Sequence, residues 1–119
     1  MVFEFYLGGY GRDNNFNIIL RDKNLYISTY HSIPLPEHFK LIQTDCDNDW
    51  LYLISYLKSC RWNKRYDSEI LDGTQWELKV KGNGININSY GSNSYPQEFD
   101  EFLGILNRLI KSTGYSIVK

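Results

Sequence analysis

Residues 70–111 decide the fold class, and they read ILDGTQWELKVKGNGININSYGSNSYPQEFDEFLGILNRLIK. Between residues 74 and 88, apolar and polar side chains alternate on both sides of Asn83-Gly84, and this period of two is typical of strands with one buried face. Asn-Gly between two alternating runs is the strongest short-range hairpin signal, because a type I′ turn needs positive φ at both central residues. The sequence therefore predicts an antiparallel hairpin around this turn.

The two faces of the predicted strands set their register. With Asn83-Gly84 as a two-residue loop, Val80 lies opposite Ile87. Trp76 then lies opposite Gly91, and a shift by one residue would mix apolar with polar side chains on each face. The second face is polar and pairs Lys81 with Asn86, Lys79 with Asn88, Glu77 with Tyr90 and Gln75 with Ser92. We expect this face to be hydrated or to bind something polar.

An amphipathic helix is predicted directly after the hairpin. Pro96 suits the first turn because that position needs no amide partner, and Ser94 with Gln97 has the spacing of a capping box. Apolar residues then recur at helical spacing up to Ile110. Gly104 weakens this helix by about 1 kcal/mol relative to alanine. The apolar stripe of the helix is expected to cover the apolar face of the hairpin.

The rest of the chain completes an α+β pattern. The expected elements are strands at 2–7, 16–20 and 25–30, a short strand at 39–44, a helix at 47–59, and a tail at 115–118 that either closes the sheet or frays. We predict an antiparallel sheet of two hairpins, in the order ββ(β)-α-ββ-α, with two amphipathic helices on one face. The two hairpins match at an offset of sixty residues, which leaves both a duplication and a coincidence open.

Composition narrows the function classes. A chain of 119 residues predicts one α+β domain over 1–119. Its formal charge of −1 disfavours nucleic acid as a partner. We expect a cytoplasmic protein with free thiols at Cys46 and Cys60, because no signal peptide or membrane span is evident and two cysteines make no disulfide framework. Ten Tyr and three Trp suit either a recognition surface or an ordinary sheet.

The candidate site lies at the open end of the hairpin. The expected register brings together Asp72, Gln75, Tyr90, Ser92 and Asn93, beside the start of the helix. These side chains and the free helix amides suit a polar or anionic group. Equally, Asp, Asn and Ser at strand ends often only satisfy backbone groups in turns and caps. Both interpretations remain open from the sequence.

A second candidate surface is the basic, aromatic segment 61–66, which reads RWNKRY. Arg61 and Trp62 could contact an acidic partner or single-stranded nucleic acid. The segment is short, and a solvated connection leaving a helix explains it as well.

Catalytic and metal-binding patterns are missing from the sequence. His31 and His38 belong to no spaced ligand or nucleophile motif. The series Asp45, Asp47 and Asp49 resembles a calcium loop only briefly, because Trp50 and Tyr56 stand where that loop needs Gly and Glu. Acidic residues at a helix start explain the series better. We therefore predict no enzyme activity, no metal and no cofactor.

Two runs carry a resemblance to known proteins: ILDGTQWELKV (70–80) and YGSNSYPQEFDEF (90–102). They resemble a motif of small bacterial proteins, some of which are similar to immunity proteins or other accessory proteins of bacterial conflict systems. The resemblance implies a cytosolic protein that binds and blocks a toxin domain, and it carries over no catalytic or ligand residue.

Our lead prediction is a non-enzymatic protein-binding module. The alternative is a small-ligand or nucleotide-binding module that uses the open end of the 72–95 hairpin. The sequence does not settle the oligomeric state.

Overall fold

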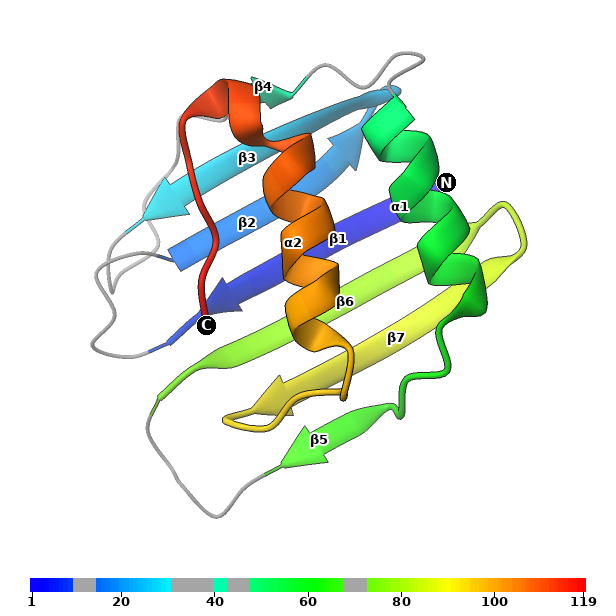
Figure 1. The fold of residues 1–119 in the computed structure, drawn as a ribbon, viewed down its shortest axis with the longest axis vertical. Coiled ribbons are helices and arrows are strands. Elements are labelled where there is room, and N and C mark those ends of the chain that lie inside the picture. The colour runs from blue at the N-terminus through cyan, green and yellow to red at the C-terminus, as the bar shows by residue number, and fades with distance from the viewer. Residues whose placement is uncertain (10–14, 31–39, 43–47, 68–72) are drawn as a thin grey trace.

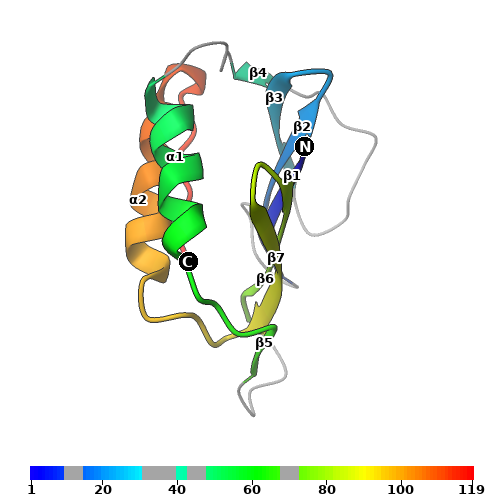
Figure 2. The same cartoon turned by 90° about the vertical axis from the view of Figure 1, so that its right-hand side faces the viewer.

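The protein folds into two layers, a seven-stranded sheet and two helices on the same side of it (Figure 1 and Figure 2). The computed structural model describes residues 1–9, 15–30, 40–42, 48–67 and 73–119. Its elements are β1 (Val2–Gly8), β2 (Asn15–Arg21), β3 (Asn24–Tyr30), β4 (Lys40–Ile42), α1 (Asn48–Ser59), β5 (Arg65–Asp67), β6 (Gln75–Gly82), β7 (Ile85–Ser92), α2 (Phe99–Leu109) and the short 3-10 helix η1 (Lys111–Thr113). The α+β class expected from the sequence is confirmed.

The sheet has the strand order β4-β3-β2-β1-β6-β7-β5, so β1 lies between the two hairpins. All neighbours are antiparallel except β5, which runs parallel to β7. The prediction of a wholly antiparallel sheet is therefore wrong at this edge, and residues 65 and 66, expected in a solvated connection, belong to β5, while 61–64 lie outside any strand. In the sequence, β6 lies between β5 and β7. The chain reverses its direction between β5 and β6 and again between β6 and β7, so β5 and β7 run in the same direction.

Both hairpins have the predicted register. Val80 lies opposite Ile87 in the β6–β7 hairpin, and Ile18 lies opposite Ile27 in the β2–β3 hairpin. Positive φ angles occur at all four loop residues, namely Asp22 (52°), Lys23 (70°), Asn83 (52°) and Gly84 (79°), as a type I′ turn requires. The two turns are sixty-one positions apart, whereas the apolar residues match at sixty. Superposing the turns therefore places apolar positions on polar ones, which does not support a duplication.

The core lies between the sheet and the helices, and aromatic rings fill one end of it. Trp76 is 1% exposed and its ring centroid is 5.0 Å from that of Phe99 and 5.6 Å from that of Trp62. Trp50 packs edge-on against Phe3 at 5.5 Å. All three tryptophans therefore contribute to the core, and the large exposed aromatic side chains among the described residues are Tyr52, Tyr90 and Tyr115.

Helix α2 begins later than the sequence predicts. It starts at Phe99, whose amide donates to the carbonyl of Pro96 at 3.1 Å. Ser94 and Gln97 therefore precede the helix and do not form the predicted capping box. The carbonyl of Ser94 instead accepts the indole N–H of Trp76 at 2.9 Å. This long-range hydrogen bond holds the chain against β6 for a few more residues before the helix begins.

The C-terminal tail neither closes the sheet nor frays, and both alternatives considered for it are wrong. The side-chain amide of Asn107 donates to the Ile117 carbonyl at 3.0 Å and accepts the Ile117 N–H at 2.7 Å. Ile117 is buried, and the tail runs beside α2 (Figure 1). Neither of the two helices in the described residues is long and apolar enough to cross a membrane.

Candidate functional site

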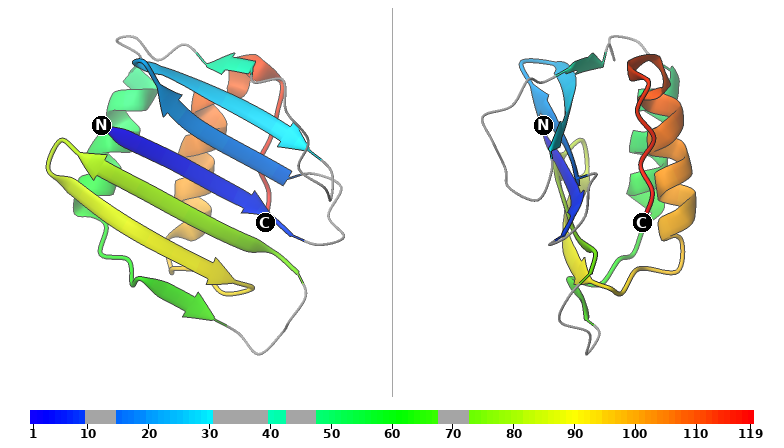
Figure 3. Two further views of the ribbon diagram at one scale, coloured as in Figure 1. Left: turned by 180° about the vertical axis from the view of Figure 1, so that it is seen from behind. Right: turned by 90° about the vertical axis from the view of Figure 1, so that its left-hand side faces the viewer.

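One face of the sheet points away from α1 and α2, as the ribbon seen from behind shows (Figure 3). Alternation along the strands sends most apolar residues to the helices and leaves mainly polar ones on this side, although Val2, Ile19 and Leu41 also lie on it. We use the name polar face for Glu4, Tyr6, Asn17, Gln75, Glu77, Lys79, Lys81, Asn86, Asn88, Tyr90 and Ser92. No helix in the described part of the chain covers it.

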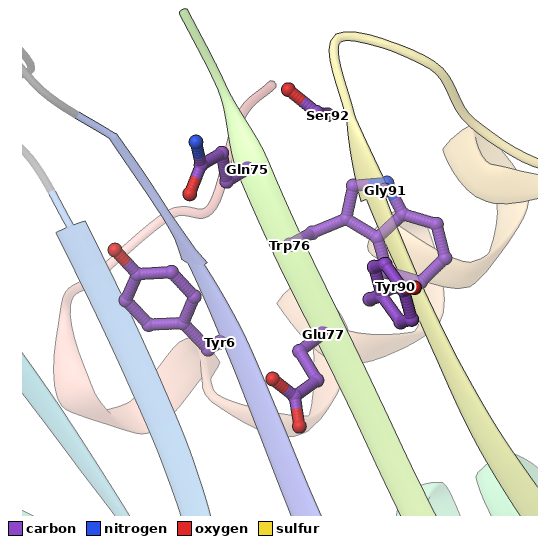
Figure 4. Close-up of a pocket in the computed structure, with 7 residues that line it drawn as sticks. All are labelled: Tyr6, Gln75, Trp76, Glu77, Tyr90, Gly91 and Ser92. Carbon is purple, nitrogen blue, oxygen red and sulfur yellow. The ribbon is translucent and has the colours of Figure 1, made fainter. Parts of the chain in front are cut away.

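A hollow of about 290 Å³ lies on the polar face, over β1, β6 and β7 (Figure 4). Tyr6, Glu77 and Tyr90 form a row across these strands, because Glu77 pairs with both tyrosines. Gln75 and Ser92 form the next pair along the same hairpin and also line the hollow. Tyr90 is 38% exposed. The hollow therefore offers aromatic surface with hydrogen-bond donors and acceptors on several sides.

Trp76 and Gly91 form the floor of the hollow, and their pairing fixes how the strands lie there. The Trp76 indole turns to the helix side and passes against the Gly91 backbone. A Cβ atom built on Gly91 would lie against Trp76 Nε1 and 2.5 Å from the Ser94 carbonyl oxygen. Glycine at this position is therefore required by a close approach, which lets β7 and the following turn pack onto the indole.

Asn93 belongs to the strand end and not to the hollow. Its backbone N–H donates to the Thr74 carbonyl at 2.8 Å, and its side-chain oxygen accepts the Thr74 N–H at 2.9 Å. Its φ of 52° lies in the left-handed region, which asparagine tolerates better than most residues. Of the two interpretations of the open end, the structural one therefore holds for Asn93. Asp72 lies outside the described residues.

Arg61 and Trp62 lie away from the hollow, where the chain leaves α1. The Arg61 guanidinium donates to the carbonyl of Cys60 at 3.1 Å and approaches that of Lys58 at 3.5 Å. Trp62 packs its ring between Trp76 and α2, on the helix side of the sheet. Trp62, one of the expected contact residues, therefore packs part of its ring against the core and remains partly exposed.

The structure thus brings together three of the predicted contact residues, Gln75, Tyr90 and Ser92. It adds Tyr6, which sequence reasoning did not include among the contacts. Residues 3–7 alternate between apolar and polar positions, and this signal could have placed Tyr6 on a polar face. Only the pairing of β1 with β6 showed that this face adjoins the hairpin.

The titratable side chains of the described residues bear on the metal and nucleophile patterns considered from the sequence. No cluster of three or more His, Cys, Asp or Glu side chains suited to a metal occurs there. Asp49 pairs with Arg108 at 3.6 Å, which fits its role as an acidic helix start; Asp45, Asp47, His31 and His38 lie outside the described residues. Burial raises the pKa of the Cys60 thiol, and the nearby Glu98 carboxylate adds to the effect. A raised thiol pKa is the reverse of what a cysteine nucleophile needs.

Comparison of the chain with protein-family models, curated proteins and solved structures gives no match.

Proposed function

We propose that this protein is a non-enzymatic binding protein, and that its polar face engages a protein partner around the hollow lined by Tyr6, Gln75, Glu77, Tyr90 and Ser92. The partner we propose is a bacterial toxin domain that the protein neutralises, as the resemblance of its two sequence runs implies.

The observation that carries the proposal is the exposed Tyr90 beside this hollow. Sites for small molecules usually bury most of their ligand in a cleft of about 300–1,000 Å³. This hollow, at about 290 Å³, is at the lower end of that range and opens onto the sheet surface between side chains. Tyrosines with an apolar ring and a polar tip are favoured in protein interfaces and often dominate their binding energy. A flat, tyrosine-bearing, polar surface suits a protein contact better than an enclosed ligand.

The alternative, a small-ligand or nucleotide site at the open end of the hairpin, has less support. The Asn93 side-chain oxygen, which could accept a hydrogen bond from such a ligand, already accepts the Thr74 N–H. Gln75 and Ser92 line the hollow and could still bind a small ligand. The capture experiment described next also tests this alternative.

The test is affinity capture from the native cell with matched tyrosine variants. Tyr90→Ala removes the exposed ring at the hollow, while the control Tyr52→Ala removes a ring that is 54% exposed on α1, in the other layer. We expect the wild type and the control to retain one stoichiometric protein, and Tyr90→Ala to bind the purified partner with a loss of about 2 kcal/mol or more, as for an interface hot spot. Urea unfolding of both variants checks that the fold is intact.

Co-expression extends this test to the toxin assignment. If the captured protein inhibits growth when expressed alone, the wild type and Tyr52→Ala should restore growth and Tyr90→Ala should not. Equal protection by both variants would contradict the role of the polar face. A captured protein without toxicity would contradict the toxin assignment alone, and a small molecule lost on Gln75→Ala would favour the alternative.

A further inference from the structure

The outer edge of β7 is paired along only part of its length. The short β5 covers Tyr90 to Ser92, and no strand of the described residues covers Asn86 or Asn88 (Figure 1). The Asn63 carbonyl accepts the hydroxyl of Ser89, a buried residue on the helix side, at 2.6 Å. On the N-terminal side of β5, the chain therefore turns from the sheet edge toward α1. No strand of the described residues lies beside residues 86–88.

The backbone of Asn86 and Asn88 faces this space. Tyr90 donates its N–H outward to the Lys64 carbonyl at 3.0 Å, whereas Asn93 donates inward to Thr74. In an antiparallel pair, alternate residues direct both of their backbone groups to the neighbouring strand and the residues between them direct theirs away from it. Asn86 and Asn88 alternate with Tyr90 in the same phase. Their N–H and C=O groups therefore point to the outer edge, ready for another strand.

A groove of about 470 Å³ lies along this edge and is basic. Asn86 and Asn88 line one side of it, and Arg61, Trp62 and Lys64 line the other. No acidic side chain from the described residues lines the groove, and none of them forms an ion pair with Arg61 or Lys64. A segment that pairs with the edge would therefore lie beside two cationic side chains.

We propose that this edge of β7 is a docking site for an extended, acidic segment of a protein partner, which adds as a strand beside Asn86–Asn88. Main-chain hydrogen bonds to the edge supply affinity in strand addition, and side chains beside it supply selectivity. Here Arg61 and Lys64 select carboxylates. The site is separate from the hollow on the polar face and stands independently of the function proposed above.

The test uses blocked pentapeptides and backbone amide NMR of the full chain. One peptide alternates threonine or valine with glutamate, and its matched control has lysine in place of glutamate. We expect the acidic peptide to shift the Asn86 and Asn88 amide signals saturably and to slow their hydrogen exchange. We expect the basic peptide to bind about tenfold or more weakly, because its lysines would lie beside the like-charged Arg61 and Lys64.

Variants separate backbone pairing from charge. Asn88→Pro removes the outward N–H, while Asn88→Ala keeps it, so only the proline variant should lose binding; proline is tolerated on an edge strand. An acidic peptide with alternate N-methylated amides makes the same test without altering the protein, and it should not bind. Arg61→Glu with Lys64→Glu should reverse the charge preference, while the control Lys111→Glu, exposed on η1, should not change it.

Several results would overturn the proposal. Unmoved Asn86 and Asn88 signals, equal binding of the acidic and basic peptides, or full binding of the N-methylated peptide would each do so. Concentration-dependent shifts of these amides without any peptide would show that a second copy of the chain occupies the edge. A single-stranded oligonucleotide that binds there more tightly than the acidic peptide would replace the proposed partner class.

Discussion

Gly91→Ala gives the sharpest test of how the floor of the hollow is built. The added Cβ would meet Trp76 Nε1, would lie 2.8 Å from Trp76 Cε2, and would lie 2.5 Å from the Ser94 carbonyl oxygen. Carbon atoms normally pack at about 3.5–4.0 Å. The indole cannot move away freely, because Trp76 is 1% exposed and packs against Phe99. The substitution must therefore displace either a core ring or the turn after β7.

The expected cost has two parts. Overpacking a filled core costs about 1–3 kcal/mol. Displacing the indole also breaks its 2.9 Å hydrogen bond to Ser94, and an unpaired buried donor costs about 1–3 kcal/mol more. We therefore expect Gly91→Ala to lower the free energy of unfolding by about 2–6 kcal/mol, a large share of the roughly 5–15 kcal/mol of a typical domain.

Urea unfolding followed by tryptophan fluorescence measures this loss. Gly104→Ala is the matched control, because its added Cβ meets nothing within 4 Å and it replaces a helical glycine. We expect it to raise the free energy of unfolding by about 1 kcal/mol. A loss below about 1 kcal/mol for Gly91→Ala, or changes of the same sign in both variants, would refute the reasoning.

Two further predictions concern buried polar groups. Ser89→Ala should lower the free energy of unfolding, measured with urea, by about 1 kcal/mol, because the Ser89 hydroxyl donates a hydrogen bond to the Asn63 carbonyl. Ser28→Ala should be neutral or stabilising, because the buried Ser28 hydroxyl has no hydrogen-bond partner among the described residues. A larger loss of stability for Ser28→Ala than for Ser89→Ala would contradict this. The raised Cys60 pKa means that the folded state holds the thiol proton more tightly, so stability should fall as pH rises above about 9, and Cys60→Ser should lessen that fall. Equal declines in both proteins would exclude this linkage.

The local elements could be predicted because their signals are contained in short stretches. Asn83-Gly84 fixes a turn type, and the alternation on each side fixes which residues pair across it. The observed pairing of Val80 with Ile87 follows from these two facts alone. β5 could not be predicted in the same way, because its three residues are too few to show a period.

The candidate site was predictable where the hairpin register alone decides neighbours. Gln75 and Ser92 were expected to pair, and they line one hollow with Tyr90. The packing of Trp62 could not be predicted, because its sequence context is basic and exposed while its ring packs against distant aromatic residues in β6 and α2. Asn93 was left open because an asparagine at a strand end suits both a ligand and a turn.

By itself the sequence determined the two hairpins, the two amphipathic helices and the polar second face of β6 and β7. Only the tertiary structure decided that β1 lies between the two hairpins. This strand order places Tyr6 beside Glu77, although the two residues are about seventy positions apart in the sequence. The tertiary structure also decided that β7 keeps part of its edge unpaired. Turns and alternation act between near neighbours, whereas strand order and ring packing depend on burying apolar faces that lie far apart along the chain.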